Sequence, residues 1–146
     1  MAPRIAIGGD HAGFELKAAL IRHLEDKGLE VRDFGGFTKE SMDYPDPAHG
    51  VADCVANGGA EIGLLICGSG NGVNIVANKH RGVRAALAWT AEIAALARQH
   101  NDANVLSLPA RYITEPEAKC IVEAFLGASF EGGRHQRRVE KIENAD

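Results

Sequence analysis

The chain has 146 residues, 45% of them hydrophobic and 25% charged, a composition typical of a soluble protein with one core, so we expect residues 1–146 to form a single domain. The formal net charge of −4 indicates neither a nucleic-acid-binding surface nor one for an anionic membrane. There is no apolar segment of membrane-spanning length, no signal-peptide pattern and no cysteine pairing expected from three scattered cysteines, so a cytoplasmic protein is predicted.

Strand-like apolar runs alternate with helical patterns along the whole chain. The first half predicts a strand at 5–8, a helix that stops at Gly28, a strand at 29–34, a helix capped by Asp46, a strand at 62–67 and a short helix at 73–78. The second half predicts a strand at 84–89, a helix capped by Thr90, a strand at 105–108, a helix opened by the Thr114–Glu117 capping box, and a last helix at 134–142.

This alternation predicts an α/β fold, with a parallel sheet covered by helices on both faces. In such folds, ligands bind at the carboxyl ends of the strands. Asp10 and His11 follow the first strand, Tyr44 lies in the loop after the second, and Cys67 ends the third. We also count His100 and Asn101, at the end of the helix after the fourth strand, among the polar residues to be placed at this edge.

The glycine-rich segment 67–72 joins the most apolar strand to the start of a helix. Its alternating glycines allow consecutive backbone N–H groups to converge on an anion, and the helix start favours a thiolate at Cys67. Val73 breaks the dinucleotide-binding fingerprint, and no Gly-Lys-Ser/Thr follows for a P-loop. The alternative is a tight turn beside a buried structural cysteine.

Other polar residues have equally simple structural interpretations when each is taken alone. Asp10 and His11 could be a helix cap and a surface histidine. Arg134 and Arg138 stand four residues apart, which suits a phosphate clamp or a solvated basic face. His100 falls on the predicted apolar face of its helix and could be a core histidine whose nitrogens are hydrogen-bonded.

Six motifs occur in an order that spans nearly the whole chain. They are Gly-Asp-His-Ala-Gly-Phe at 9–14, Asp-Tyr-Pro at 43–45, Ile-Cys-Gly-Ser-Gly-Asn-Gly at 66–72, Ala-Asn-Lys at 77–79, Arg-Gln-His-Asn-Asp at 98–102 and Gly-Gly-Arg-His-Gln at 132–136. With them the chain resembles the ribose-5-phosphate isomerase B family, which also includes allose-6-phosphate and galactose-6-phosphate isomerases. The resemblance implies a three-layer αβα domain with a Rossmann-like five-stranded sheet and an extra C-terminal helix. It also implies a homodimer with active sites built from both subunits, and dimers that could pair further.

The resemblance further implies interconversion of D-ribose 5-phosphate and D-ribulose 5-phosphate through an enediolate, without cofactor or metal. Cys67 would move the proton between C1 and C2, and His100 would open the furanose ring. The family's second catalytic style needs a glutamate where this chain has Val73, so Cys67 is the only candidate base. The implied roles of the other residues are hydroxyl contacts and proton transfer by Ser69 and Asp10, an oxyanion hole at Gly68, Gly70, Asn71 and Gly72, phosphate binding by His11, Arg111, Arg134 and Arg138, and sugar contacts by Tyr44 and Asn101.

Two alternatives stay open. An isomerase of a six-carbon sugar phosphate would use the same scaffold with more room between the Cys67 loop and the arginines. A non-catalytic sugar-phosphate-binding module would need the phosphate clamp alone, and the joint presence of Cys67, His100 and Ser69 argues against it. His23, His49 and His80 have no metal-ligand spacing, so no metal is predicted.

Overall fold

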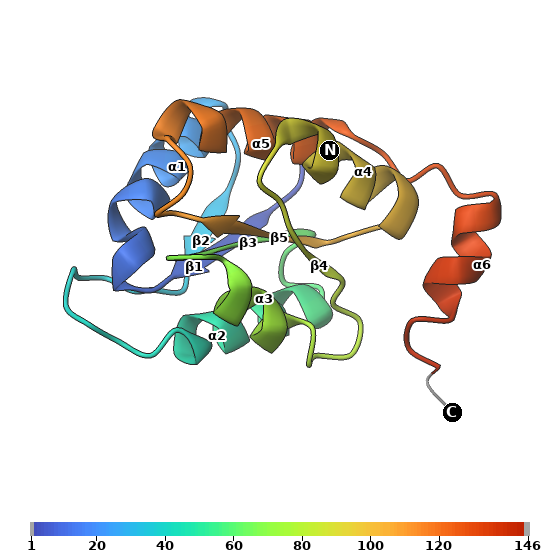
Figure 1. Cartoon of the computed structure of the whole chain (residues 1–146), viewed down its shortest axis with the longest axis horizontal. Helices are drawn as coiled ribbons and strands as arrows, with labels where there is room; N and C mark the ends of the chain where they lie inside the picture. Colours follow the sequence, from blue (N-terminus) through green and yellow to red (C-terminus); the bar gives the residue numbers. More distant parts are fainter. Residues whose placement is uncertain (1, 145–146) are drawn as a thin grey trace.

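Five strands form one parallel sheet in the order β2-β1-β3-β5-β4 (Figure 1). The protein is described here from a computed structural model that covers residues 2–144. The strands are β1 (Ile5–Gly9), β2 (Val31–Asp33), β3 (Ile62–Cys67), β4 (Ala85–Leu87) and β5 (Val105–Pro109). The register pairs Cys67 with Pro109 and Ile66 with Gly9, so the carboxyl ends of the three central strands lie level with one another.

Helices cover both faces of this sheet, which confirms the predicted fold class. They are the 3₁₀ turn η1 (His11–Gly13), α1 (Phe14–Asp26), α2 (Pro45–Ala56), α3 (Asn71–Ala77), α4 (Ala91–Asn101), α5 (Glu115–Gly127) and α6 (Arg134–Glu140). In Figure 1, α1, α4 and α5 lie on one side of the sheet and α2 and α3 on the other. The short helix α6 stands beside the end of α4, apart from both layers.

The central strand β3 explains why two hydrophobic cores form. All six of its residues are buried, and successive side chains of a strand point to opposite faces. Leu64 and Ile66 therefore join the core under α1, α4 and α5, whereas Leu65 joins the core under α2 and α3. A strand that is apolar on both faces is the signature of a parallel sheet covered by helices on both faces.

Several predicted element boundaries needed correction. Helix α2 begins at Pro45 after Tyr44, so Asp46 lies in its first turn and does not cap it. The edge strands β2 and β4 are shorter than predicted, and α6 ends at Glu140. The buried face of α4 consists of Ala94 and Ala97, whereas Ile93 is 49% exposed. The structure confirms the Thr90 cap of α4 and the Thr114–Glu117 capping box of α5.

Candidate active site

A pocket of about 310 Å³ opens at the carboxyl edge of the sheet, where β1, β3 and β5 end. Seven of its lining residues were expected from the sequence, and the eighth, Tyr112, was not. The lining residues are Asp10, Tyr44, Cys67, Gly68, Ser69, Gly72, Arg111 and Tyr112. A thiol, a carboxylate, a hydroxyl and a guanidinium group therefore share one small cavity, as the position of ligand sites in parallel sheets predicts.

The loop after β3 gives this pocket its floor. Cys67 is the last residue of β3 and is only 5% exposed. Gly70 caps α3 in the left-handed conformation (φ +78°), and a Cβ there would lie 2.5 Å from the Leu87 side chain. A Cβ on Gly72 would lie 2.5 Å from the Tyr44 ring, so glycine permits this aromatic ring to contact the loop. The first N–H groups of a helix have no partner within it, and in α3 the N–H of Asn71 donates to the Ser69 hydroxyl of the same loop.

Asp10 and His11 are held in defined orientations. The Asp10 carboxylate accepts hydrogen bonds from the N–H groups of Ala12 (3.0 Å) and Gly13 (3.3 Å). The helix-cap interpretation of Asp10 is therefore correct, and the same buried residue also lines the pocket. His11 Nδ1 accepts a hydrogen bond from the Met42 N–H (3.2 Å), so the neutral ring carries its proton on Nε2.

Lys17 is a functional candidate that the sequence interpretation missed. Its side chain is buried, and Nζ donates to both carboxylate oxygens of Asp33 (2.7 and 2.9 Å) and to the Gly36 carbonyl (2.8 Å). These bonds fix the start of the loop that leads from β2 to Tyr44. The sequence signal that could have identified Lys17 as buried is its position, because it lies three residues before Leu20, on the apolar face of α1.

His100 and Asn101 do not reach the pocket within one chain, which corrects their expected place. Helix α4 runs antiparallel to the strands, because it connects the carboxyl end of β4 to the amino end of β5. Asn104, which follows α4, accepts a hydrogen bond from the Gly63 N–H at the amino end of β3. The end of α4 therefore lies at the edge of the sheet opposite to Cys67.

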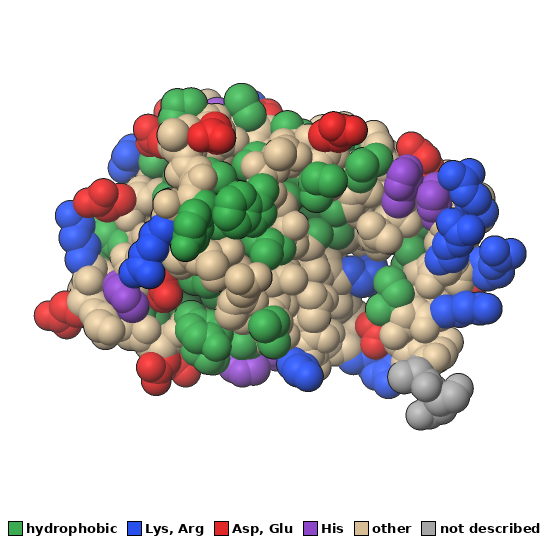
Figure 2. Space-filling view, viewed as in Figure 1, with side chains coloured by type: hydrophobic (Ala, Val, Ile, Leu, Met, Phe, Trp, Pro, Cys, Tyr) green, Lys and Arg blue, Asp and Glu red, His purple; other side chains and the backbone are tan. Residues whose placement is uncertain are grey.

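Arg134 and Arg138 lie on α6, beside the end of α4 (Figure 1). Both side chains are exposed, and the basic side chains on this part of the molecule are visible as a group in Figure 2. Within a single chain, the two arginines thus form the solvated basic face that was the simpler interpretation.

Asn71, in the loop after β3, is also exposed, and its N–H donates to the Ser69 hydroxyl (3.3 Å).

A second group of polar residues, the histidine cluster, consists of His100, Glu131 and His135. The two imidazole rings are stacked with centroids 4.3 Å apart and planes 10° from parallel. Glu131 Oε1 lies 3.7 Å from His100 Nε2 and 3.8 Å from His135 Nε2. Burial lowers the pKa of His135 below its usual value, and the neighbouring His100 acts in the same direction. His100 is partly exposed at 39% and is no core residue.

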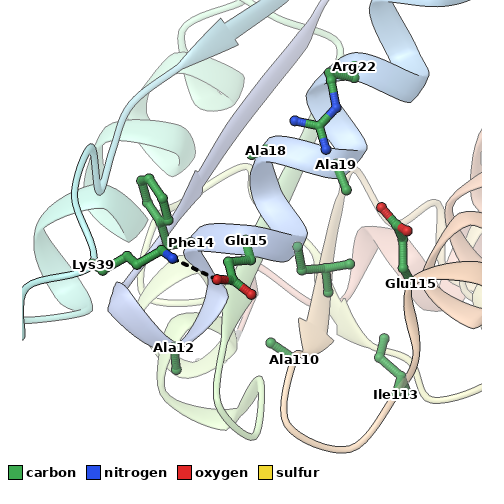
Figure 3. Close-up of a pocket in the computed structure, with 11 residues that line it drawn as sticks. Ala12, Phe14, Glu15, Ala18, Ala19, Arg22, Lys39, Ala110, Ile113 and Glu115 are labelled. Carbon is green, nitrogen blue, oxygen red and sulfur yellow. Dashed lines mark ion pairs between the residues drawn. The ribbon is translucent and has the colours of Figure 1, made fainter.

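A larger hollow of about 620 Å³ lies between α1 and the segment after β5 (Figure 3). Small alanine side chains form much of its surface, and the Glu15–Lys39 ion pair (2.8 Å) lies on one side of it. None of the predicted site residues lines this hollow, and it holds no thiol, histidine or hydroxyl group. The smaller pocket at Cys67 is therefore the candidate active site.

Within residues 2–144, no helix is both long and apolar enough to span a membrane.

Comparison with known proteins shows which family the chain resembles over nearly its whole length. Residues 5–142 match the family described as Ribose/Galactose Isomerase. Ribose-5-phosphate isomerase B of Escherichia coli K12 is 50% identical over 139 residues, which are 95% of this chain and 93% of that protein. A ribose 5-phosphate isomerase structure from Thermotoga maritima has a TM-score of 0.97 at 47% identity and covers 99% of this chain and 100% of that one. The ribose-5-phosphate isomerase B of Mycoplasma genitalium, solved with bound ribulose-5-phosphate, has a TM-score of 0.93 at 49% identity and covers 97% and 94%.

Proposed function

The chain belongs to the ribose/galactose isomerase family, and from this premise we propose that it interconverts D-ribose 5-phosphate and D-ribulose 5-phosphate. Relatives about half identical over nearly their full length carry that activity in their names, and one was solved with the ketose phosphate bound. The observation that carries the proposal is the pocket itself, which brings the Cys67 thiol together with Ser69, Asp10 and Arg111.

Cys67 is proposed to be the base that moves the proton. Aldose–ketose exchange through an enediolate requires one group that removes a proton from C2 and returns it to C1. Cys67 is the only thiol on the pocket wall, and the buried Val73 cannot take a proton. The negative charge that develops on the substrate oxygen needs fixed donors, which the backbone amides of Gly68, Gly70, Asn71 and Gly72 would supply. Ser69 and Asp10 would bind the sugar hydroxyls and pass protons between its oxygens.

The remaining site residues are proposed to come from a second copy of the chain. His100, Asn101, Arg134 and Arg138 lie at the opposite edge of the sheet, so in a homodimer they would complete the partner's pocket. His100 would open the sugar ring, Asn101 and Tyr44 would contact the sugar, and the two arginines, His11 and Arg111 would bind the phosphate. Arginine suits this task because its planar guanidinium group offers several donors to phosphate oxygens.

Exposed apolar side chains between the two half-sites support this assembly. Tyr112 on the pocket wall is 61% exposed and lies against Trp89, with ring centroids 5.3 Å apart and planes tilted by 31°. Trp89 and Ile93 are each 49% exposed at the start of α4, and Ile75 on α3 is 61% exposed. Figure 2 shows hydrophobic side chains gathered on the face that carries α3 and α4 in Figure 1. Such side chains mark interaction surfaces when they form a patch.

The first test is turnover of ribose 5-phosphate by the purified chain and by Cys67→Ser. A serine hydroxyl without an activating partner is too weak an acid to serve as this base, so kcat should fall by about a hundredfold or more while KM changes little. Cys120→Ser, which alters an exposed cysteine that does not line this pocket, is the matched control and should keep wild-type activity. Activity of Cys67→Ser within about tenfold of wild type would end the proposed role of Cys67.

The second test mixes two inactive variants, Cys67→Ser and Arg134→Ala/Arg138→Ala. If each site combines groups from two subunits, a mixed dimer contains one intact site, and activity should return on subunit exchange. Mixed dimers detected by native mass spectrometry without recovered activity would contradict the shared site.

A third test concerns the substrate, because the family's description also names galactose. The ratio of kcat/KM for ribose 5-phosphate over allose and galactose 6-phosphates decides between five- and six-carbon substrates. Saturable sugar-phosphate binding without turnover of any of them would indicate a binding module.

A further inference from the structure

We propose that the histidine cluster is a binding site for one divalent transition-metal ion of the Zn²⁺ class. His100, Glu131 and His135 each offer one ligand atom, and these three atoms all lie within 4.8 Å of one another. The residues come from three segments, the end of α4, the α5–α6 connection and the first turn of α6, so the fold brings them together across 35 residues of sequence. Neither the family's description nor the proposed isomerase chemistry assigns a metal to them.

The distances in the cluster are close to those of a coordination sphere. Zinc bonds of about 2.0–2.2 Å place neighbouring ligand atoms roughly 3.4 Å apart in a tetrahedron. The two histidine–carboxylate separations are 3.7 and 3.8 Å. The two imidazole rings are stacked nearly parallel, so the partly exposed His100 side chain must rotate before both nitrogens point at one ion. The Glu131 N–H donates to the Gln99 carbonyl (3.0 Å), which holds the Glu131 backbone beside the end of α4.

The donor set also selects the class of ion. Two imidazole nitrogens and one carboxylate oxygen suit Zn²⁺, Co²⁺ or Ni²⁺, whereas Mg²⁺ and Ca²⁺ require mainly oxygen ligands. Among residues 2–144, the only basic groups within 4.0 Å of the Glu131 carboxylate are these two histidines, so no lysine or arginine occupies it. Arg134 and Arg138 on the same helix add positive charge nearby and should make binding weaker than in closed structural zinc sites.

Another histidine pair provides a matched control. His49 and His80 have ring centroids 4.9 Å apart, and His80 faces the Asp53 carboxylate (3.1 Å). Their facing nitrogens are already joined by a hydrogen bond of 2.7 Å, and the remaining His80 nitrogen faces Asp53. This second group therefore also has two histidines and a carboxylate, but its histidine nitrogens already bind each other and Asp53.

The binding test uses the full-length protein freed of metal by chelation and then titrated with Co²⁺, which reports its ligands by visible absorption. We expect one ion per chain, an absorption spectrum of low-symmetry nitrogen and oxygen ligation, and displacement by Zn²⁺. Glu131→Gln keeps the shape of an exposed side chain and should weaken binding about tenfold or more, since even indirect metal contacts are worth that much. His49→Asn should bind as the wild type does.

Four results would overturn the site. Three are the absence of saturable binding, a thiolate-to-cobalt charge-transfer band that places the ion on a cysteine, and equal affinity of wild type and Glu131→Gln. The fourth is loss of binding in His49→Asn, which would move the ion to the other histidine pair.

A functional consequence follows, and it rests on the proposed isomerase function. An ion on His100 occupies the imidazole that would open the sugar ring, so Zn²⁺ should slow turnover of ribose 5-phosphate more than that of ribulose 5-phosphate. Glu131→Gln should be less sensitive to Zn²⁺ than wild type. Equal sensitivity of wild type and Glu131→Gln to Zn²⁺ would refute this consequence and place the inhibition at Cys67. If the chain shows no isomerase activity, the cobalt titration still decides whether the metal site exists.

Discussion

Replacing Lys17 with methionine should be among the more damaging single changes near the active site. Methionine is unbranched like lysine, has nearly the same volume and fits an apolar surrounding, so the change removes the charge with little change in packing. It leaves the Asp33 carboxylate and the Gly36 carbonyl without the donor that now binds three oxygen atoms at 2.7–2.9 Å. The Lys17 side chain is only 3% exposed, so water cannot take its place.

The size of the loss follows from the burial of both partners. Removing one partner of a buried ion pair costs about 3–5 kcal/mol, because the other charge is left without compensation. The Asp33 side chain is 31% exposed and keeps part of its hydration, so we expect a loss of about 2–3 kcal/mol in the free energy of unfolding. In a chain of this length, that loss lowers the melting temperature by roughly 4–12 °C.

Urea unfolding followed by circular dichroism measures this loss directly. Lys39→Met is the control, because Lys39 lies on the same loop and pairs with Glu15 while both side chains are more than two-thirds exposed. The melting temperature of Lys39→Met should equal that of wild type within the error of the measurement. If Lys17→Met is as stable as Lys39→Met, the buried ion pair does not anchor the loop, and this reasoning is wrong.

Three further outcomes are expected. The Ser107 hydroxyl is fully buried and has no hydrogen-bond partner within residues 2–144, so Ser107→Ala should raise the urea-unfolding free energy by about 1 kcal/mol. Gly72→Ala should melt no lower than wild type but lose isomerase activity, because the added methyl group displaces the Tyr44 ring, a shift that tyrosine fluorescence would report. Hydrogen bonds from the Thr114 backbone and hydroxyl lower the pKa of Glu117. This cap therefore stabilises the fold at a pH above the usual pKa of 4.5, and its contribution is lost as the pH falls through the lower pKa of the folded state. The difference in melting temperature between wild type and Thr114→Ala should shrink in acid.

The parts of the fold that depend on local chemistry were predictable from the sequence. The Thr114–Glu117 capping box and the two-sided apolar run of β3 act within a few residues, so their patterns are visible along the chain. The Asp46 cap was wrong because Pro45 already suits the first turn of a helix and starts α2 earlier. Pro47, two residues after Pro45, gave the same signal at a shifted position.

The candidate site shows where prediction from one chain stops. The pocket residues around Cys67 follow parallel strands that are neighbours in the sheet, so the fold rule alone brings them together. The place of His100 depends on the direction of α4, which reverses the edge on which its end lies. Lys17 was missed because its partner Asp33 is 16 residues away in the sequence. Glu131 was missed because its partner His100 lies on another segment. No local pattern records such contacts.

The separation of α6 from both hydrophobic cores bears on how this protein can change over evolutionary time. Among residues 2–144, the side chains that build the two cores end at Leu126, so the segment that carries Arg134 and Arg138 contributes little to the stability of the sheet. Substitutions that destabilise a protein are normally removed by selection, but this segment is largely free of that constraint. Arg134 and Arg138, two of the four residues proposed to bind the phosphate, can therefore vary independently of the sheet that holds Cys67. A scaffold divided in this way can acquire a preference for longer sugars while its folding stability stays unchanged.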